Sequence, residues 1–182
     1  MLDVILEQPM GEKFVMLALA NTDQRLREDK PASPAFLFAA LLWHEVLSAW
    51  NAHLDAGKPA IQSLHFAMDE VLDKQRAHMA IPHRHDAIMK EIWLLQPRFE
   101  QRAGHRPLRL LELPRFRAAY DFLLLRCHSG EVDAELGDWW TEFQEASDVR
   151  RAEMLMPDKG PKKRRRRSKK PSGQSAAEST SA

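Results

Sequence analysis

The sequence contains one cysteine, Cys127, and this scarcity excludes several kinds of site. A single thiol cannot form an internal disulfide, and it cannot supply the ligands of a cysteine-based zinc site. The composition therefore fits a reducing compartment. Because Cys127 lies among apolar residues at helical spacing, we expect it to pack in a core rather than to act as a thiolate beside His128.

Long apolar runs are also lacking. The longest, Ala35–Trp43, has nine residues, whereas a membrane-spanning helix needs about 20. The first residues, Met1–Val4, include no basic side chain and do not have the pattern of a signal peptide. The sequence thus predicts a soluble, cytoplasmic protein with no membrane partner.

Glycine is scarce too, with 7 in the chain, and the apolar residues recur at helical rather than alternating spacing. We predict an all-α fold: a helical bundle of about six or seven helices with a disordered basic C-terminal tail. The segment Pro34–Ala56, with Ser33 as its N-cap, is expected to be the most buried helix. The other helices are expected over residues 11–28, 61–79, 88–99, 115–128 and 136–143.

The same periodicity predicts individual positions. The apolar stripe of the 61–79 helix is expected to begin at Ile61. Pro114 is expected in the first turn of the 115–128 helix, where its missing N–H costs nothing, and Gly130 is expected to end that helix. Trp139 and Trp140 could stack on bases, but their spacing favours packing, and we expect at least one of them to be buried.

The near-neutral net charge of +1 conceals an uneven distribution. Residues 157–182 hold nine Lys and Arg against two acidic residues, a local net charge of +7. This leaves 18 basic and 24 acidic residues over 1–156, a net charge of −6. We therefore divide the chain into a helical domain over 1–156 and a Lys/Arg-rich tail over 157–182, which has too few apolar residues to offset the entropy of ordering.

The basic residues of the tail form a run that is typical of contact with a polyanion. A phosphate backbone relieves the repulsion between neighbouring cations and releases condensed counterions. Nucleic-acid binding is therefore favoured over a solvated solubility tail, and over an anionic membrane surface, for which no apolar anchor is present. The predicted contacts are Lys162, Lys163, Arg164, Arg165, Arg166, Arg167, Lys169 and Lys170.

Residues 1–156 show no pattern of a catalytic centre. The sequence has neither a phosphate-binding glycine loop nor a Gly-x-Ser-x-Gly elbow. Three histidines, His78, His83 and His85, lie close together, but only Asp86 accompanies them, so an exposed helix junction is favoured over a metal site. Acidic residues before the last helix are expected to suit its dipole: Glu131, Asp133 and Glu135.

Several longer segments resemble a known family. They are Arg115–Arg126, Glu135–Trp140 with Phe143-Gln144, Asn21-Thr22-Asp23, Pro34–Ala40 and Ile81–Arg84, followed by the basic tail. In this order and spacing they resemble the C-terminal region of bacterial poly(A) polymerases, over about residues 10 to 170. Related CCA-adding tRNA nucleotidyltransferases lack this extended C-terminal part.

The resemblance implies a function for the whole enzyme and a division within it. In that family an N-terminal catalytic head binds ATP after a Gly-Ser motif and holds two magnesium ions with aspartates. It transfers AMP to RNA 3′ ends, in mRNA polyadenylation, RNA processing and RNA decay. This sequence has no Gly-Ser followed by paired aspartates, so we expect no catalytic residue, no metal ligand and no cofactor in this chain, which is expected to be inactive alone.

What the resemblance carries over is the RNA-holding helical region. Four arginines are spaced at four, four and three residues and would share one face of a continuous helix: Arg98, Arg102, Arg106 and Arg109. Arg115, Arg117 and Arg126 are further candidates for RNA contact. An ordinary solvated or salt-bridged face remains the alternative for all of these arginines.

RNA is therefore the expected partner, with RNA-decay proteins as further partners. Two alternatives stay open. The chain could be a helical protein-interaction module of the RNA-decay machinery whose basic tail serves solubility. It could also receive a catalytic head from a neighbouring polypeptide.

Overall fold

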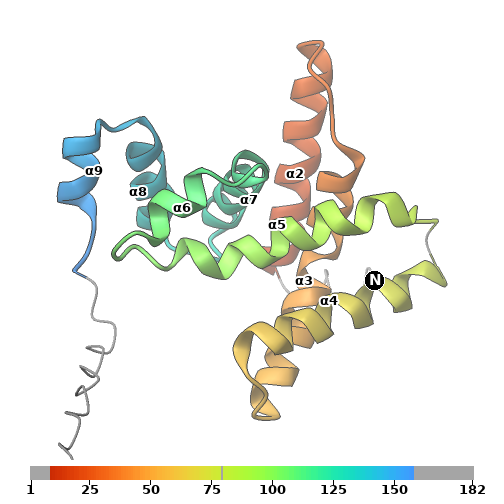
Figure 1. Ribbon diagram of the computed structural model, residues 1–182. Helices are drawn as coiled ribbons and strands as arrows, with labels where there is room; N and C mark the ends of the chain where they lie inside the picture. Colours follow the sequence, from red (N-terminus) through yellow and green to blue (C-terminus); the bar gives the residue numbers. More distant parts are fainter. Residues whose placement is uncertain (1–8, 79, 158–182) are drawn as a thin grey trace, which may run out of the picture.

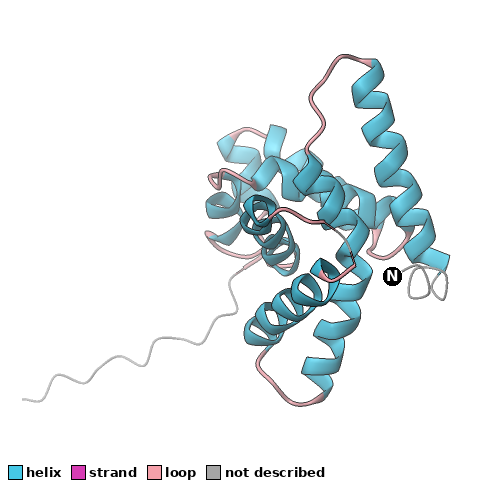
Figure 2. Cartoon of the chain, turned by 90° about the vertical axis from the view of Figure 1, so that its right-hand side faces the viewer, coloured by secondary structure: helices cyan, strands magenta, loops and turns pink. Residues whose placement is uncertain are grey.

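The computed structural model describes residues 9–78 and 80–157, and the regular elements in these ranges are all helical (Figures 1 and 2). The all-α prediction is therefore confirmed. The elements, in chain order, are α2 (Pro9–Arg27), α3 (Pro34–Asp55), α4 (Ala60–Arg76), the 3-10 turn η1 (His83–His85), α5 (Asp86–Phe99), α6 (Arg106–Leu111), α7 (Phe116–Ser129), α8 (Ala134–Glu145) and α9 (Asp148–Met154).

The described residues form eight α-helices, more than the six or seven expected. The difference comes from α6 and α9, which have six and seven residues. A helix of this length contains fewer than two turns, so it cannot show a recurring apolar stripe in the sequence. The tail from residue 158 onward lies outside the described residues, and the boundary between domain and tail stays a prediction.

Capping residues set the start of α3 and the end of α7 as expected. The Phe36 amide donates to Ser33 Oγ at 3.4 Å at the start of α3. At the end of α7, Gly130 has a φ of 90°, a left-handed conformation that residues with a Cβ rarely adopt. The sequence signals for these two ends are therefore confirmed.

The prediction for Pro114 is wrong by two residues. Helix α7 begins at Phe116 with Arg115 as its N-cap, so Pro114 lies outside the first turn. The reason is a tight turn before the helix, in which the Phe116 amide donates to Leu113 O at 2.9 Å. Pro97 lies within α5, and that helix ends soon afterwards at Phe99.

The buried side chains form two clusters that share α5 and α7. The first cluster gathers α2, α3, α4, the first part of α5 and the inner side of α7. The second gathers the end of α5 with α6, the other buried face of α7 and α8. Figure 1 shows α5 crossing the molecule from the α3–α4 side to the α6–α8 side. Helices α5 and α7 therefore connect the two halves of the core.

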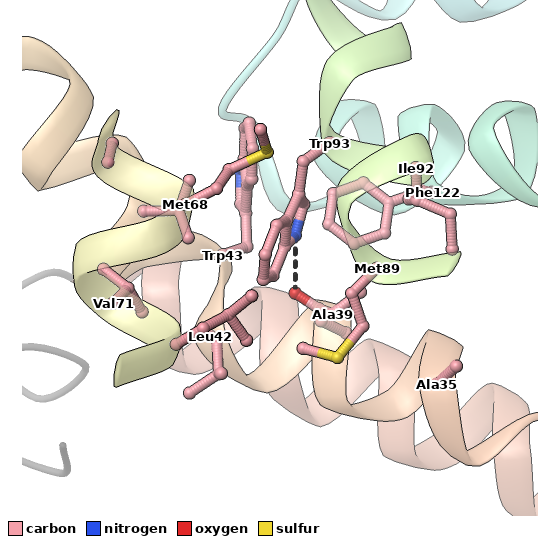
Figure 3. Packing of buried hydrophobic residues seen from close by; sticks show 14 of the residues in the cluster. Ala35, Ala39, Leu42, Trp43, Met68, Val71, Met89, Ile92, Trp93 and Phe122 are labelled. Atoms are coloured by element: carbon pink, nitrogen blue, oxygen red, sulfur yellow. Dashed lines mark hydrogen bonds between the residues drawn. The ribbon is translucent and has the colours of Figure 1, made fainter. Parts of the chain in front are cut away.

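Helix α3 supplies the centre of the first cluster, as expected from its apolar sequence. Trp43 is completely buried, and so is Trp93 on α5, whose indole Nε1 donates to Ala39 O at 3.1 Å. Figure 3 shows these two indoles between α3 and α5, with Met68 of α4 on one side and Phe122 of α7 on the other. A buried indole N–H needs such an acceptor, so this contact fixes the register between α3 and α5.

One predicted core position is wrong. Ile61 is 55% exposed, although Leu64 on the same helix is fully buried. Ile61 lies in the first turn of α4, and the buried face of the helix begins only with Ser63 and Leu64. A periodic stripe therefore located the buried face of the helix but not the point where packing starts.

Over residues 9–78 and 80–157, no helix combines the length and the apolar character that crossing a bilayer requires.

Candidate nucleic-acid interface

The strongest sequence candidates lie beyond the part of the chain that the structure describes. The run Lys162–Lys170 falls wholly after residue 157. Its eight predicted contacts therefore stay a sequence-based prediction, and the structure bears only on the candidates in the helical domain.

The four arginines of the helical domain do not lie on one continuous helix. Arg98 is in the last turn of α5, and Arg102 follows in the connection to α6. Arg106 and Arg109 belong to α6, which is a separate helix. The expected common helical face therefore does not form, because α5 ends at Phe99. Whether these arginines contact RNA stays a prediction.

Arg102 in particular has structural contacts. Its Nη1 donates to Glu135 Oε1 at 3.0 Å, and its guanidinium lies 5.9 Å from the centroid of the Trp139 ring. Its carbonyl accepts from the Met156 amide at 3.1 Å. Arg102 therefore links the connection after α5 to α8 and to the segment after α9, a role that a periodic spacing does not reveal.

The tryptophan pair is used for packing. Trp140 is fully buried, and its Nε1 donates to Phe99 O at 2.9 Å. Trp139 stacks on Phe143 with ring centroids 4.6 Å apart. The expectation that at least one indole is buried is confirmed.

Arg126, a further candidate for RNA contact, is mostly buried and ion-paired. Its Nε donates to Glu131 Oε1 at 2.8 Å, and 12% and 9% of the two side chains are exposed. The guanidinium also lies 4.9 Å from the centroid of the Trp43 ring and donates to Gln96 Oε1 at 3.3 Å. This arginine is therefore committed to contacts inside the protein, and the salt-bridged alternative applies at this position.

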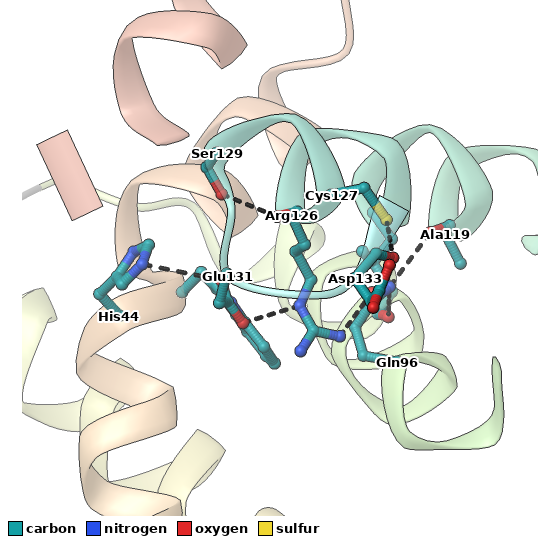
Figure 4. Close-up of polar contacts among 10 residues, drawn as sticks. His44, Gln96, Ala119, Arg126, Cys127, Ser129, Glu131 and Asp133 are labelled. Atoms are coloured by element: carbon teal, nitrogen blue, oxygen red, sulfur yellow. Dashed lines mark hydrogen bonds and ion pairs between the residues drawn. The ribbon is translucent and has the colours of Figure 1, made fainter. Parts of the chain in front are cut away.

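Glu131 completes a polar junction between three helices (Figure 4). Both carboxylate oxygens accept from Trp43 Nε1 of α3, at 3.1 and 2.9 Å. Gln96 of α5 donates to Ala119 O of α7 at 3.1 Å, next to Arg126. We call Arg126, Glu131, Trp43 and Gln96 the polar junction. Glu131 thus serves the junction rather than the dipole of α8, whereas Asp133 is the N-cap of α8, as the sequence predicted for the acidic residues there.

His44 is the buried histidine next to the polar junction. It is buried, its Nε2 lies 3.7 Å from Glu131 Oε2, and neither ring nitrogen has a hydrogen-bond partner among the described residues. Burial lowers the pKa of His44, and the Arg126 guanidinium acts in the same direction, while the Glu131 carboxylate opposes them. The neutral imidazole is therefore the favoured form in the folded protein.

Cys127 and the histidine group show no arrangement for catalysis. Burial raises the pKa of the Cys127 thiol, which supports the expected packing role. His83 and His85 lie in η1, where His83 contacts Asp86 and His85 packs against Phe38. Among the residues that the structure describes, no three His, Cys, Asp or Glu side chains are grouped as metal ligands would be.

A hollow of about 590 Å³ lies between α2, the connection from α2 to α3, the first turn of α3, α5 and α7. We call it the α2–α7 groove. Partly exposed apolar side chains in its lining include Phe36, Ile88 and Leu124. Its charged lining residues are Arg25, Lys30, Arg115, Arg117, Glu28 and Asp121.

The sequence did not indicate this groove. Only Arg115 and Arg117 among its residues had been expected to contact RNA, and Arg98, Arg102 and Arg106 are not part of its lining. The helices that form it are far apart in the chain, and α2 and α7 meet only in the folded protein. No local pattern could therefore have shown it; the mixed basic and apolar character of the start of α7 was the nearest signal.

Comparison with known proteins identifies a family of similar sequences. A family model described as the polymerase A arginine-rich C-terminus matches residues 56–172, which include α4 to α9 and the Lys/Arg run. Poly(A) polymerase I of Salmonella typhi is 39% identical over 163 residues, which cover 87% of this chain and 35% of that protein. Poly(A) polymerase I of Escherichia coli O157:H7 is 40% identical over 165 residues, covering 88% and 35%.

A more distant relative, poly(A) polymerase I of Haemophilus influenzae, is 33% identical over 151 residues, which cover 82% of this chain and 33% of that protein. This chain therefore spans about a third of the length of the curated relatives that it matches.

The contributions of Arg126 and Glu131, the buried ion pair of the polar junction, to the free energy of unfolding are predicted to be strongly coupled. Arg126→Met and Glu131→Gln each leave one partly buried charge without its partner, which costs about 3–5 kcal/mol for a fully buried pair. The double variant removes both charges and is predicted to lose clearly less than the two single losses together. Urea denaturation of the four proteins measures this coupling.

The matched control for this cycle is the exposed pair Arg117 and Asp121, which are 3.0 Å apart on α7. The same cycle with Arg117→Met and Asp121→Asn is predicted to give a coupling within about 0.5 kcal/mol. A coupling for Arg126 and Glu131 that is no larger than this would contradict the assigned role of the polar junction.

His44 is predicted to make the folded protein less stable as the pH falls. The unfolded chain binds a proton on His44 near its ordinary pKa of 6.5, whereas burial lowers the pKa in the folded state. Stability is therefore unaffected by His44 well above pH 6.5 and declines below it, by at most about 1.4 kcal/mol per pH unit. His44→Phe, which keeps a ring beside Phe14, is predicted to reduce the loss measured by urea denaturation between pH 7.5 and 5.

His65→Phe is the matched control, because His65 is exposed on α4. It is predicted to leave the pH dependence of the unfolding free energy as in the parent chain. Equal pH dependence in the His44→Phe and parent proteins would show that His44 takes up its proton equally in both states.

Proposed function

The chain belongs to the family of bacterial poly(A) polymerases through their arginine-rich C-terminal region, and from this premise we propose that it is the RNA-binding portion of such an enzyme. The whole enzyme would add AMP from ATP to RNA 3′ ends, in mRNA polyadenylation, RNA processing and RNA decay. We propose that this enzyme acts on RNA in the cytoplasm and that RNA-decay proteins are further partners.

The observation that carries the proposal is the extent of the family match. It reaches from residue 56 to residue 172, so the helices and the basic run are matched together. A polymerase that extends RNA without a template must hold its substrate whatever the base sequence, and contacts to phosphate meet this need. The Lys162–Lys170 run offers such contacts, because cations on a strand gain affinity by releasing counterions.

The catalytic step is proposed to reside elsewhere in the enzyme. The matched relatives are about three times as long as the match. ATP and magnesium are therefore assigned to the part of the family's sequence that this chain does not span. What this chain's own residues would do is bind and hold RNA.

Deleting residues 162–170 is predicted to weaken RNA binding and its salt dependence. If six to eight of the cations in this segment each neutralise a phosphate of single-stranded RNA, the slope of log K against log salt is roughly −4 to −6. We expect the deletion to remove most of this slope for a 15-nucleotide oligoadenylate, measured by fluorescence anisotropy from low to physiological salt.

Deletion of residues 173–182 is the control, because that segment has a similar length and holds no Lys or Arg. It is expected to leave affinity and slope unchanged. If removal of 162–170 also leaves both unchanged, the basic run has no role in RNA binding. If RNA binding is absent altogether while protein capture from a lysate survives nuclease treatment, the interaction-module alternative replaces the proposal.

The chain alone is predicted to add no AMP to RNA. Purified protein is incubated with radiolabelled ATP, magnesium and an RNA primer, and products are separated on a denaturing gel. A full-length poly(A) polymerase serves as the positive control. Extension of the primer by this chain, persisting through repeated purification, would contradict the assignment of the chemistry to another part of the enzyme.

A further inference from the structure

We propose that the α2–α7 groove binds nucleotides of single-stranded RNA, with a base against its apolar surface and a phosphate beside Arg25. This inference rests on the proposed function and assigns it a place on the helical domain. The volume of about 590 Å³ lies within the range of pockets that hold small molecules, about 300–1,000 Å³.

The charge of the groove differs in sign from that of the protein around it. Its lining holds four Lys and Arg against two acidic residues, a net charge of +2. The described residues as a whole hold 18 basic and 22 acidic residues, a net charge of −4. An acidic surface repels a polyanion, so a positive hollow in it is a place where a phosphate backbone could approach the helices.

Among the cations of this lining, Arg25 is the best placed to bind a phosphate. Its Nε and Nη2 donate to Pro31 O at 3.3 and 3.1 Å, which holds the guanidinium in place. None of the ion pairs among the described residues includes Arg25. A fixed guanidinium with a full charge binds phosphate without first leaving a carboxylate.

The other cations of the lining are engaged at the surface and can exchange partners. Lys30 contacts Glu28 at 2.6 Å, and Arg117 contacts Asp121 at 3.0 Å. Arg115 contacts Glu91, outside the lining, at 2.8 Å, and both of these side chains are about half exposed. Exposed pairs of this kind contribute about 0–1 kcal/mol, so a phosphate can replace the carboxylate at little cost.

The apolar part of the groove suits the face of a base. Phe36 is partly buried and is held edge-on by Phe122, with ring centroids 5.9 Å apart. Ile88 of α5 and Leu124 of α7, both partly exposed, extend this surface. Contact between a base and such side chains is independent of sequence, because every base has an apolar face. An apolar surface beside a fixed cation favours a nucleotide over an acidic peptide, which brings charge without a flat apolar ring.

The contribution of the phosphate is tested by reversing one charge in the full chain. Arg25→Glu is expected to weaken binding of a 15-nucleotide oligoadenylate at least about fivefold and to lower the magnitude of the salt slope by about 0.7 or more. Arg27→Glu makes the same change two residues later on α2, at an exposed position outside the groove lining. It is expected to change affinity less than about twofold, because residues two apart on a helix do not face the same side and salt screens a charge that makes no direct contact with the strand.

The contribution of the base is tested by filling the groove without changing charge. Ala118 lines the groove, so Ala118→Phe places a ring where the base is proposed to lie. The parent chain is expected to bind oligoadenylate more tightly than an abasic strand of equal length, and Ala118→Phe is expected to lose most of this preference. Ala152→Phe, at an exposed position on α9, is the control and is expected to retain it.

Thermal unfolding of each variant verifies that it folds. The charge-reversal test and the groove-filling test are independent of each other. If Arg25→Glu and Ala118→Phe both bind RNA as the parent does, while deletion of residues 162–170 abolishes binding, the groove inference is overturned and the proposed function stands. If the parent chain binds no RNA, both fail. If the two variants impair only nuclease-resistant capture of a protein, the groove is a protein site and the RNA inference is overturned.

Discussion

The buried ion pair between Arg126 and Glu131 is the interaction on which the arrangement of the helices depends. It lies where the two clusters of the core meet, and through Trp43 and Gln96 it joins α3, α5 and α7. A buried charge is tolerated only with its partners in place, so the pair allows few alternative packings of these three helices. The same helices, with α2, form the walls of the α2–α7 groove. The polar junction therefore sets the shape of the surface to which we assign nucleotide contact.

We assign RNA binding to two kinds of contact. The Lys/Arg run would supply affinity and rapid encounter through charge, without discrimination between bases. The groove would add a defined position for a nucleotide on a rigid scaffold, in a domain that otherwise carries excess negative charge. Such a combination would suit a strand of uniform sequence such as poly(A), the product that the name of the relatives gives. The excess negative charge would also discourage RNA from spreading over the rest of the domain.

Local patterns were sufficient for much of the fold. Ser33 and Gly130 marked helix ends correctly, because capping depends on residues within a few positions of each other. The short helices α6 and α9 were missed, since they hold too few turns to show a period. The candidate RNA-contact residues of the helical domain were less predictable from the sequence. Arg126 is a basic residue of the kind that contacts RNA. Only its contact with Trp43, which is far away in the sequence, shows that the Arg126 side chain faces inward. The groove is likewise a product of tertiary packing.

The central claim is that the helical domain itself, and not only the Lys/Arg run, contacts RNA. Titration of the isotope-labelled full chain with oligoadenylate, followed by methyl and amide NMR spectra, tests it most directly. The account predicts concentration-dependent shifts of Ile88, Ile92, Leu124 and Ala118 signals together with those of the basic run, while signals of α9 stay in place. Shifts confined to residues 159–170, with the signals of α2, α5 and α7 unchanged at saturation, would contradict it.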